Sequence, residues 1–140
     1  MKDNEMHLEF PSRPENVAFA RATVAAFASQ LDPTLPEVAD ISTAVSEAVT
    51  NAVVHAYPNG EGSVRVHVRL SGRTVKIEVV DQGVGIADTA KTKQELDERM
   101  GIGLSLMEAC MDLVELSSEH GGTRVYMEKK LGVQGSCPDD

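Results

Sequence analysis

Short stretches of alternating apolar and polar residues recur along the chain, and such alternation is typical of β-strands with one buried side. In the first stretch, Glu5–Phe10, the apolar residues Met6, Leu8 and Phe10 fall on one side. The dipeptide Ser71-Gly72 separates two later stretches and predicts a hairpin turn between them. The alternation predicts strands at Glu5–Phe10, Ser63–Leu70, Thr74–Val80, Leu113–Ser118 and Thr123–Lys130.

Other stretches place apolar residues three or four positions apart, which is the spacing of an amphipathic helix. They predict helices from about Pro14 to Leu31, from Leu35 to Ala56 and from Ile102 to Met111. The intervening segment Asp81–Met100 has glycines followed by a charged, weakly helical stretch, and we expect it to be irregular. This order of elements predicts an α/β two-layer sandwich, with a mostly antiparallel mixed sheet and helices on one face.

The chain length of 140 residues is that of one ordinary domain. We expect this domain to cover residues 1–131 and the polar residues 132–140 to form a disordered tail. No apolar run approaches the roughly 20 residues that cross a bilayer, and the charged N-terminus does not have the pattern of a secretory signal. The sequence therefore predicts a cytoplasmic protein.

The formal net charge is −9, from 13 basic and 22 acidic residues. Such a balance argues against direct binding to nucleic acid or to an anionic membrane, since both require positive charge on the protein. It suits a partner with a basic surface, and equally a soluble protein without one. Cys110 and Cys137 stand alone and the four histidines are scattered, so their spacing predicts no structural metal site.

A carboxylate and an amide lie four positions apart on the second predicted helix, at Glu47 and Asn51. This spacing places them side by side, next to the apolar stripe. The amide oxygen of Asn51 suits Mg²⁺, and Glu47 can accept a proton. The plainer alternative is a pair of exposed polar residues without a role.

Two glycine-containing motifs follow. Asp81-Gln-Gly83-Val-Gly85 comes directly after a predicted strand, where an acid can accept a hydrogen bond and glycines allow a ligand close to the backbone. Gly101-Ile-Gly103 precedes a predicted helix, whose free amides are suited to a phosphate. Each motif is also compatible with ordinary turns. Neither completes a Rossmann fingerprint, and the chain has no P-loop and no protein-kinase signature.

The order of these motifs is more specific than any one of them. E-x-x-x-N on a helix, D-x-G-x-G after a strand, G-x-G before a helix and Gly122-Thr123 entering a strand resemble the GHKL ATP-binding family. The resemblance covers residues 5–131 and implies the Bergerat ATP-binding fold. Within that family, the segments NEMHLEF, FARATVAAF and SEAVTNAVVHAY are similar to the anti-sigma-F serine kinases of endospore-forming bacteria.

This resemblance implies a function and its partners. A member of this family binds a sporulation sigma factor, uses Mg²⁺ and ATP to phosphorylate a serine of an anti-anti-sigma protein, and works as a homodimer. Carried onto this chain, Glu47 is the general base, Asn51 holds Mg²⁺ and Asp81 binds the adenine amino group. The remaining residues implied in nucleotide binding are Gly83, Gly85, Lys93, Arg99, Gly101, Gly103 and Thr123.

The chain departs from the family pattern between Asp81 and Gly101, where the spacing is short. The shortening falls in Ala87–Met100, which the resemblance identifies as the ATP lid, and either Lys93 or Arg99 is expected to reach the γ-phosphate. Outside the lid, Arg21 matches an arginine that contacts both protein partners in the family. Its alternative interpretation is an ordinary solvated arginine.

Three other functions fit the sequence less well. One is an ATP-binding anti-sigma module without kinase turnover, which the pairing of Glu47 with Asn51 disfavours. Another is the related kinase that regulates a general-stress sigma factor. A third is the catalytic domain of a histidine kinase, but the chain shows no helical hairpin with a phosphoacceptor histidine. The first strand can pair between subunits or within its own sheet, and the sequence leaves both arrangements open.

Overall fold

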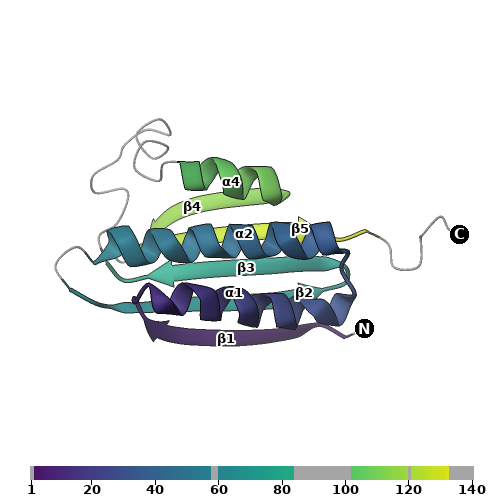
Figure 1. Cartoon of the computed structure of the whole chain (residues 1–140), viewed down its shortest axis with the longest axis horizontal. Coiled ribbons are helices and arrows are strands. Elements are labelled where there is room, and N and C mark those ends of the chain that lie inside the picture. Colours follow the sequence, from purple (N-terminus) through teal and green to yellow (C-terminus); the bar gives the residue numbers. More distant parts are fainter. Residues whose placement is uncertain (1, 58–59, 84–101, 120, 133–140) are drawn as a thin grey trace, which may run out of the picture.

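The computed structural model describes residues 2–57, 60–83, 102–119 and 121–132, and it has two layers (Figure 1). One layer is a five-stranded sheet in the order β1-β2-β3-β5-β4, in which every neighbouring pair is antiparallel. The strands are β1 (Asn4–Pro11), β2 (Ser63–Ser71), β3 (Thr74–Asp81), β4 (Leu113–Glu119) and β5 (Gly122–Lys130).

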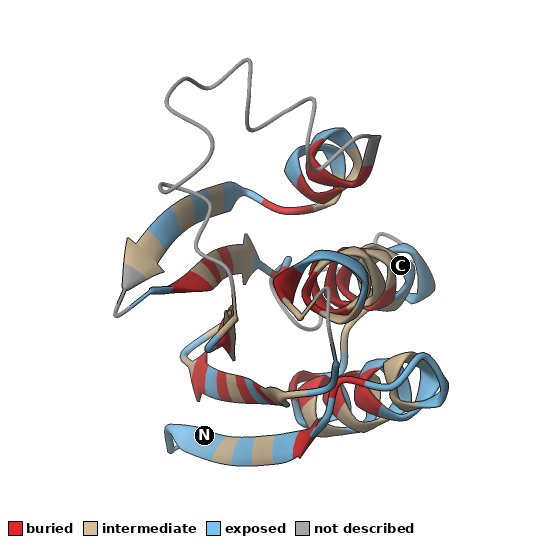
Figure 2. Cartoon of the chain, turned by 90° about the vertical axis from the view of Figure 1, so that its left-hand side faces the viewer, coloured by how far each residue is buried: buried red, intermediate tan, exposed pale blue. Residues whose placement is uncertain are grey.

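The other layer consists of helices that cover one face of this sheet (Figure 2). In it, α2 packs between α1 and α4. The helices are α1 (Glu15–Ala28), α2 (Leu35–Asn51) and α4 (Ile102–Cys110), with a 3₁₀ turn η1 (Ser29–Leu31) and a π-helical turn η2 (Ala52–Ala56). Within the described residues, no helix has the length and apolar character needed to cross a membrane.

Burial follows the alternation predicted from the sequence. Along β2 the apolar residues Val64, Val66, Val68 and Leu70 are buried under the helices, while the residues between them lie on the open face (Figure 2). The central strand β3 repeats the pattern. This burial explains the register, because a slip by one residue would turn the apolar side chains out to solvent.

Local signals fix the bounds of α2. Thr34 and Glu37 form a capping box, in which the Glu37 amide donates to Thr34 Oγ1 at 3.2 Å and the Thr34 amide donates to Glu37 Oε1 at 2.8 Å. Such a box satisfies two amides at the helix start that otherwise have no partner. The predicted helix Leu35–Ala56 is present, but its last turn, η2, is π-helical.

The predicted fold class is confirmed, and all strand pairs among the described residues are antiparallel. The first strand pairs with β2 along its whole length, so it belongs to its own sheet and forms one edge of it. The predicted tail, apart from Gly132, and the predicted lid lie outside the described residues.

Candidate functional site

The C-terminal part of α2 meets the start of α4, and this contact brings Glu47, Asn51 and Gly103 together. A Cβ atom built on Gly103 would lie 2.8 Å from Glu47 Oε1 and 3.5 Å from Asn51 Nδ2. A side chain at position 103 would therefore crowd the carboxylate. Because position 103 is glycine, the carboxylate and the amide both lie against the backbone of the first turn of α4, where helix amides are free to bind an anion.

The side-chain amide of Asn51 has an unused hydrogen-bonding atom. Among the described residues, Asn51 Nδ2 and Ser46 Oγ are the buried side-chain nitrogen or oxygen atoms without a hydrogen-bond partner. Buried polar atoms in folded proteins nearly always have such a partner. The π-helical turn η2 follows directly after Asn51, and turns of this kind are frequent at functional sites. The unpartnered NH₂ group of the Asn51 side chain is thus suited to donate a hydrogen bond to a bound ligand.

A second cluster forms where β3 ends. Asp81 is only 6% exposed, and its Oδ1 accepts hydrogen bonds from the amides of Gly83, at 3.0 Å, and of Thr123, at 3.3 Å. Thr123 lies directly opposite Asp81 on β5 and is also buried. Burial raises the pKa of the Asp81 carboxyl, and the two amides oppose this shift. The result is a buried acid at the rim of the sheet.

The turn after α2 connects the two clusters. A Cβ atom built on Gly83 would overlap the carbonyl oxygen of Ala56, so the chain after β3 lies directly against η2. The hydroxyl of Tyr57 accepts a hydrogen bond from the Gln82 amide at 2.8 Å and donates one to the Ser63 carbonyl at 2.7 Å. The ends of α2 and β3 and the starts of α4 and β5 all lie at one end of the molecule (Figure 1).

Of the remaining predicted site residues, Arg21 is among those that the structure describes. Gly85, Lys93, Arg99 and Gly101 lie outside the described residues. Arg21 is exposed on α1, which packs against α2. The structure therefore brings together six of the predicted positions in two clusters. Glu47, Asn51 and Gly103 form one cluster, and Asp81, Gly83 and Thr123 form the other.

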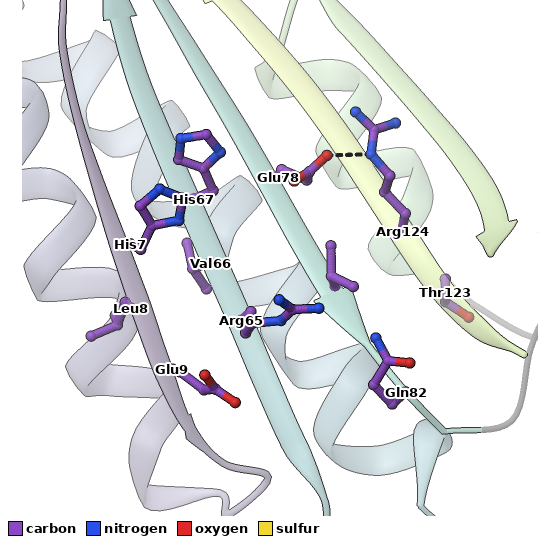
Figure 3. Close-up of a pocket in the computed structure, with 11 residues that line it drawn as sticks. His7, Leu8, Glu9, Arg65, Val66, His67, Glu78, Gln82, Thr123 and Arg124 are labelled. Atoms are coloured by element: carbon purple, nitrogen blue, oxygen red, sulfur yellow. Dashed lines mark hydrogen bonds and ion pairs between the residues drawn. The ribbon is translucent and has the colours of Figure 1, made fainter. Parts of the chain in front are cut away.

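Sequence reasoning missed two features. It gave no role to Tyr57, whose hydroxyl connects the start of β2 to the residue after β3. An aromatic residue at the end of a helix is a weak signal for such a role. It also gave no role to the open face of the sheet, where a groove of about 490 Å³ crosses β1, β2, β3 and β5 (Figure 3). In this groove Glu78 and Arg124 form an ion pair.

The buried acid leads to a prediction on stability. When an acid has a higher pKa in the folded than in the unfolded state, its ionisation destabilises the folded protein. The free energy of unfolding therefore falls as the pH rises through this range. Asp81→Asn keeps an oxygen for the amides of Gly83 and Thr123 but carries no charge. We expect this variant to have a higher free energy of unfolding than the wild type at pH 7 in urea denaturation.

The advantage of Asp81→Asn should disappear as the pH falls below the ordinary range of aspartate, where the wild-type carboxyl is protonated in both states. Asp3→Asn is the matched control, because Asp3 is exposed and its ion pair with Arg69 is long, at 3.8 Å. A variant at position 81 that is less stable than the wild type at pH 7 would contradict the prediction.

Comparison with known proteins supports the sequence interpretation. The family model "Histidine kinase-like ATPase domain" matches residues 10–129. The anti-sigma F factor of Pasteuria penetrans is 54% identical over 140 residues, which cover 94% of this chain and 93% of the relative. The anti-sigma F factor of Clostridium beijerinckii is 46% identical over 141 residues, which cover 95% of this chain and 99% of the relative.

A solved structure agrees with the fold. The crystal structure of the RsbU and RsbW domains of a Mycobacterium tuberculosis protein matches with a TM-score of 0.70 at 24% identity, over 91% of this chain and 32% of that one. At that identity the match speaks for the fold alone. The resemblance found in the sequence is confirmed by the family model and the relatives together: the chain belongs to the family of histidine kinase-like ATPase domains and, within it, to the anti-sigma F factors.

Proposed function

We propose that this protein is an anti-sigma factor that binds and inhibits a sporulation sigma factor. We further propose that it uses Mg²⁺ and ATP to phosphorylate a serine on its anti-anti-sigma antagonist. The observation that carries the proposal is the contact of Glu47 and Asn51 with the first turn of α4 at Gly103, where Asn51 has a buried and unused amide nitrogen.

The residues of the first cluster fit a metal-bound triphosphate. The Asn51 amide oxygen would serve as a ligand of Mg²⁺, which prefers hard oxygen ligands and is usually held by few protein groups together with the phosphates. The Gly103 amide, with that of Gly101, would donate to phosphate oxygens at the start of α4. Mg²⁺ would supply neutralisation of the phosphate charge.

The second cluster fits the other end of the nucleotide. Asp81 would accept a hydrogen bond from the adenine amino group, while its bonds to the Gly83 and Thr123 amides hold the carboxylate in place. Thr123 and Gly85 would assist directly or through water. Either Lys93 or Arg99 would reach the γ-phosphate.

Glu47 would act on the serine rather than on the nucleotide. Its carboxylate would orient the hydroxyl and accept its proton as the serine oxygen forms a bond to the γ-phosphorus and ADP leaves. The Glu47 carboxylate is next to Asn51 and not inside the Asp81 cluster. Adenine binding and phosphoryl transfer would therefore depend on different residues.

The proposed protein partners follow from the family. The relatives carry the name of anti-sigma F factor at 46–54% identity over nearly their full length. The formal net charge of −9 is complementary to a sigma factor with a basic surface. Arg21 is exposed on α1 and is proposed to contact both the sigma factor and the antagonist. The protein is proposed to act as a homodimer.

The direct test combines γ-labelled ATP, Mg²⁺ and a purified anti-anti-sigma protein with the full chain. We expect label on a serine of the antagonist, and capture of the sigma factor by the unlabelled chain when ATP is present. Binding of ATP without transfer of label would overturn the kinase proposal and favour an anti-sigma module that uses ATP only as a ligand. A failure to bind ATP would overturn the proposal as a whole.

A further inference from the structure

Two histidines and a glutamate that are far apart in the sequence meet on the open face of the sheet. His7 on β1 lies directly opposite His67 on β2, and Glu5 lies two positions before His7, so all three occupy the side away from the helices. The distance from His67 Nε2 to Glu5 Oε1 is 2.7 Å, and that from His7 Nε2 to the same oxygen is 3.8 Å. Figure 3 shows the two imidazoles side by side at one end of the groove.

These three side chains have the composition and spacing of a metal-ligand set. One ligand atom from each, two imidazole nitrogens and a carboxylate oxygen, lies within 4.8 Å of the others. Ligand atoms on one Zn²⁺ ion lie about 2.0–2.2 Å from it, so they are about 3–3.5 Å from one another, which is close to the spacing seen. Imidazole ligands favour Zn²⁺, Ni²⁺ and Cu²⁺ over Mg²⁺ and Ca²⁺.

The three side chains can adjust to an ion. The imidazole rings are stacked, with centroids 4.0 Å apart and an angle of 11° between their planes, so one ring must turn before both nitrogens point at one ion. The His7 side chain is 74% exposed, which leaves its ring free to turn, whereas that of His67 is 31% exposed and more firmly placed.

We propose that Glu5, His7 and His67 form a binding site for one divalent transition-metal ion, with Zn²⁺ as the probe of choice. The site is independent of the proposed kinase function, since it lies on the face of the sheet opposite the helix that carries Glu47. A bound ion would connect the edge strand β1 to β2, and water would complete its coordination. It would thereby hold in place an edge strand, which has only one neighbouring strand in the sheet.

The test is a titration of the full chain with Zn²⁺, without nucleotide or Mg²⁺, followed through the imidazole signals in ¹H–¹⁵N spectra. We expect the signals of His7 and His67 to shift together at one equivalent of metal, and that of His55 to stay in place. Movement of other signals with those of His7 and His67 unmoved would overturn the proposal, and would place the metal elsewhere, for example at a cysteine.

Substitutions test the same site by affinity. Loss of a residue that only hydrogen-bonds to a metal ligand lowers metal affinity by about 10–100-fold. Loss of a ligand itself should cost no less, so His67→Gln and His7→Gln should each lower Zn²⁺ affinity by at least about tenfold. Glu5→Gln should lower it as well. His55→Gln and Glu9→Gln are the matched controls, because His55 is exposed on η2 and Glu9 lies on β1 beyond His7.

Thermal unfolding gives a second measure that does not depend on spectral assignment. Zn²⁺ should raise the melting temperature of the wild type and of both control variants, because an ion that binds only the folded state stabilises it. It should raise that of His67→Gln by clearly less, because this variant binds the ion more weakly. An equal rise in wild type and His67→Gln would overturn the proposal.

Discussion

Glu47→Ala is expected to lower phosphorylation of the antagonist serine by about 10²–10⁴-fold, because a positioned general base contributes about that much to proton transfer. Nucleotide affinity should stay near that of the wild type. The reason is local: Glu47 Oε1 lies beside the start of α4, while the acid proposed to hold adenine is Asp81, on β3. The measurement is single-turnover transfer of label from ATP, with nucleotide affinity measured in parallel.

The conservative variant and a distant control make the Glu47 result specific. Glu47→Gln keeps the shape of the side chain but is a poor proton acceptor, so it should be as slow as Glu47→Ala. Glu115→Ala removes an exposed glutamate from β4 and should leave transfer unchanged. Near-normal transfer by Glu47→Ala would remove this residue from the mechanism.

Asn51→Ala is expected to weaken Mg²⁺-dependent ATP binding and, at the same time, to keep or raise stability. A hydrogen bond or ligand contact to a charged group contributes about 1.5–3 kcal/mol, so affinity should fall about 10- to 150-fold. Stability should not fall, because Asn51 Nδ2 is buried without a partner and its removal relieves an unsatisfied polar group.

Ser46→Ala separates the two effects of the Asn51 change. Ser46 Oγ is also buried without a hydrogen-bond partner, and it is on the same helix. Its removal should raise stability in the same way but leave ATP affinity unchanged, because no nucleotide contact is proposed for it. An Asn51→Ala variant whose ATP affinity equals that of the wild type, with and without Mg²⁺, would contradict the metal role.

The elements of the fold were predictable because their signals are local. Alternation along β2 and the helical spacing of α2 are each contained in fewer than about 20 residues, and burial of one side enforces them. The order of the strands was not predictable in this way. Pairing of β1 with β2 joins Asn4 to Leu70, and nothing in either segment alone specifies the other.

The candidate site was predictable in its members but not in its geometry. The order of motifs indicated Glu47, Asn51, Asp81 and Gly103, whereas the approach of Gly103 to Glu47 depends on how α4 packs on α2. The π-helical turn was missed because the apolar spacing through Ala56 suits an α-helix equally well. The histidine pair was missed because His7 and His67 become neighbours only through strand pairing.

The contacts of Gly83 and Gly103 have a consequence for how this domain can vary. These two glycines flank the stretch that joins β3 to α4, and each lies against the same continuous piece of chain, from Glu47 to Ala56. The positions of Gly83 and Gly103 are thus set by their contacts with this segment and not by the length of the chain between them. Doubling the length of a flexible connection costs only about 0.6 kcal/mol in closure entropy. Insertions and deletions between these two glycines should therefore have little effect on the folding of the rest of the domain.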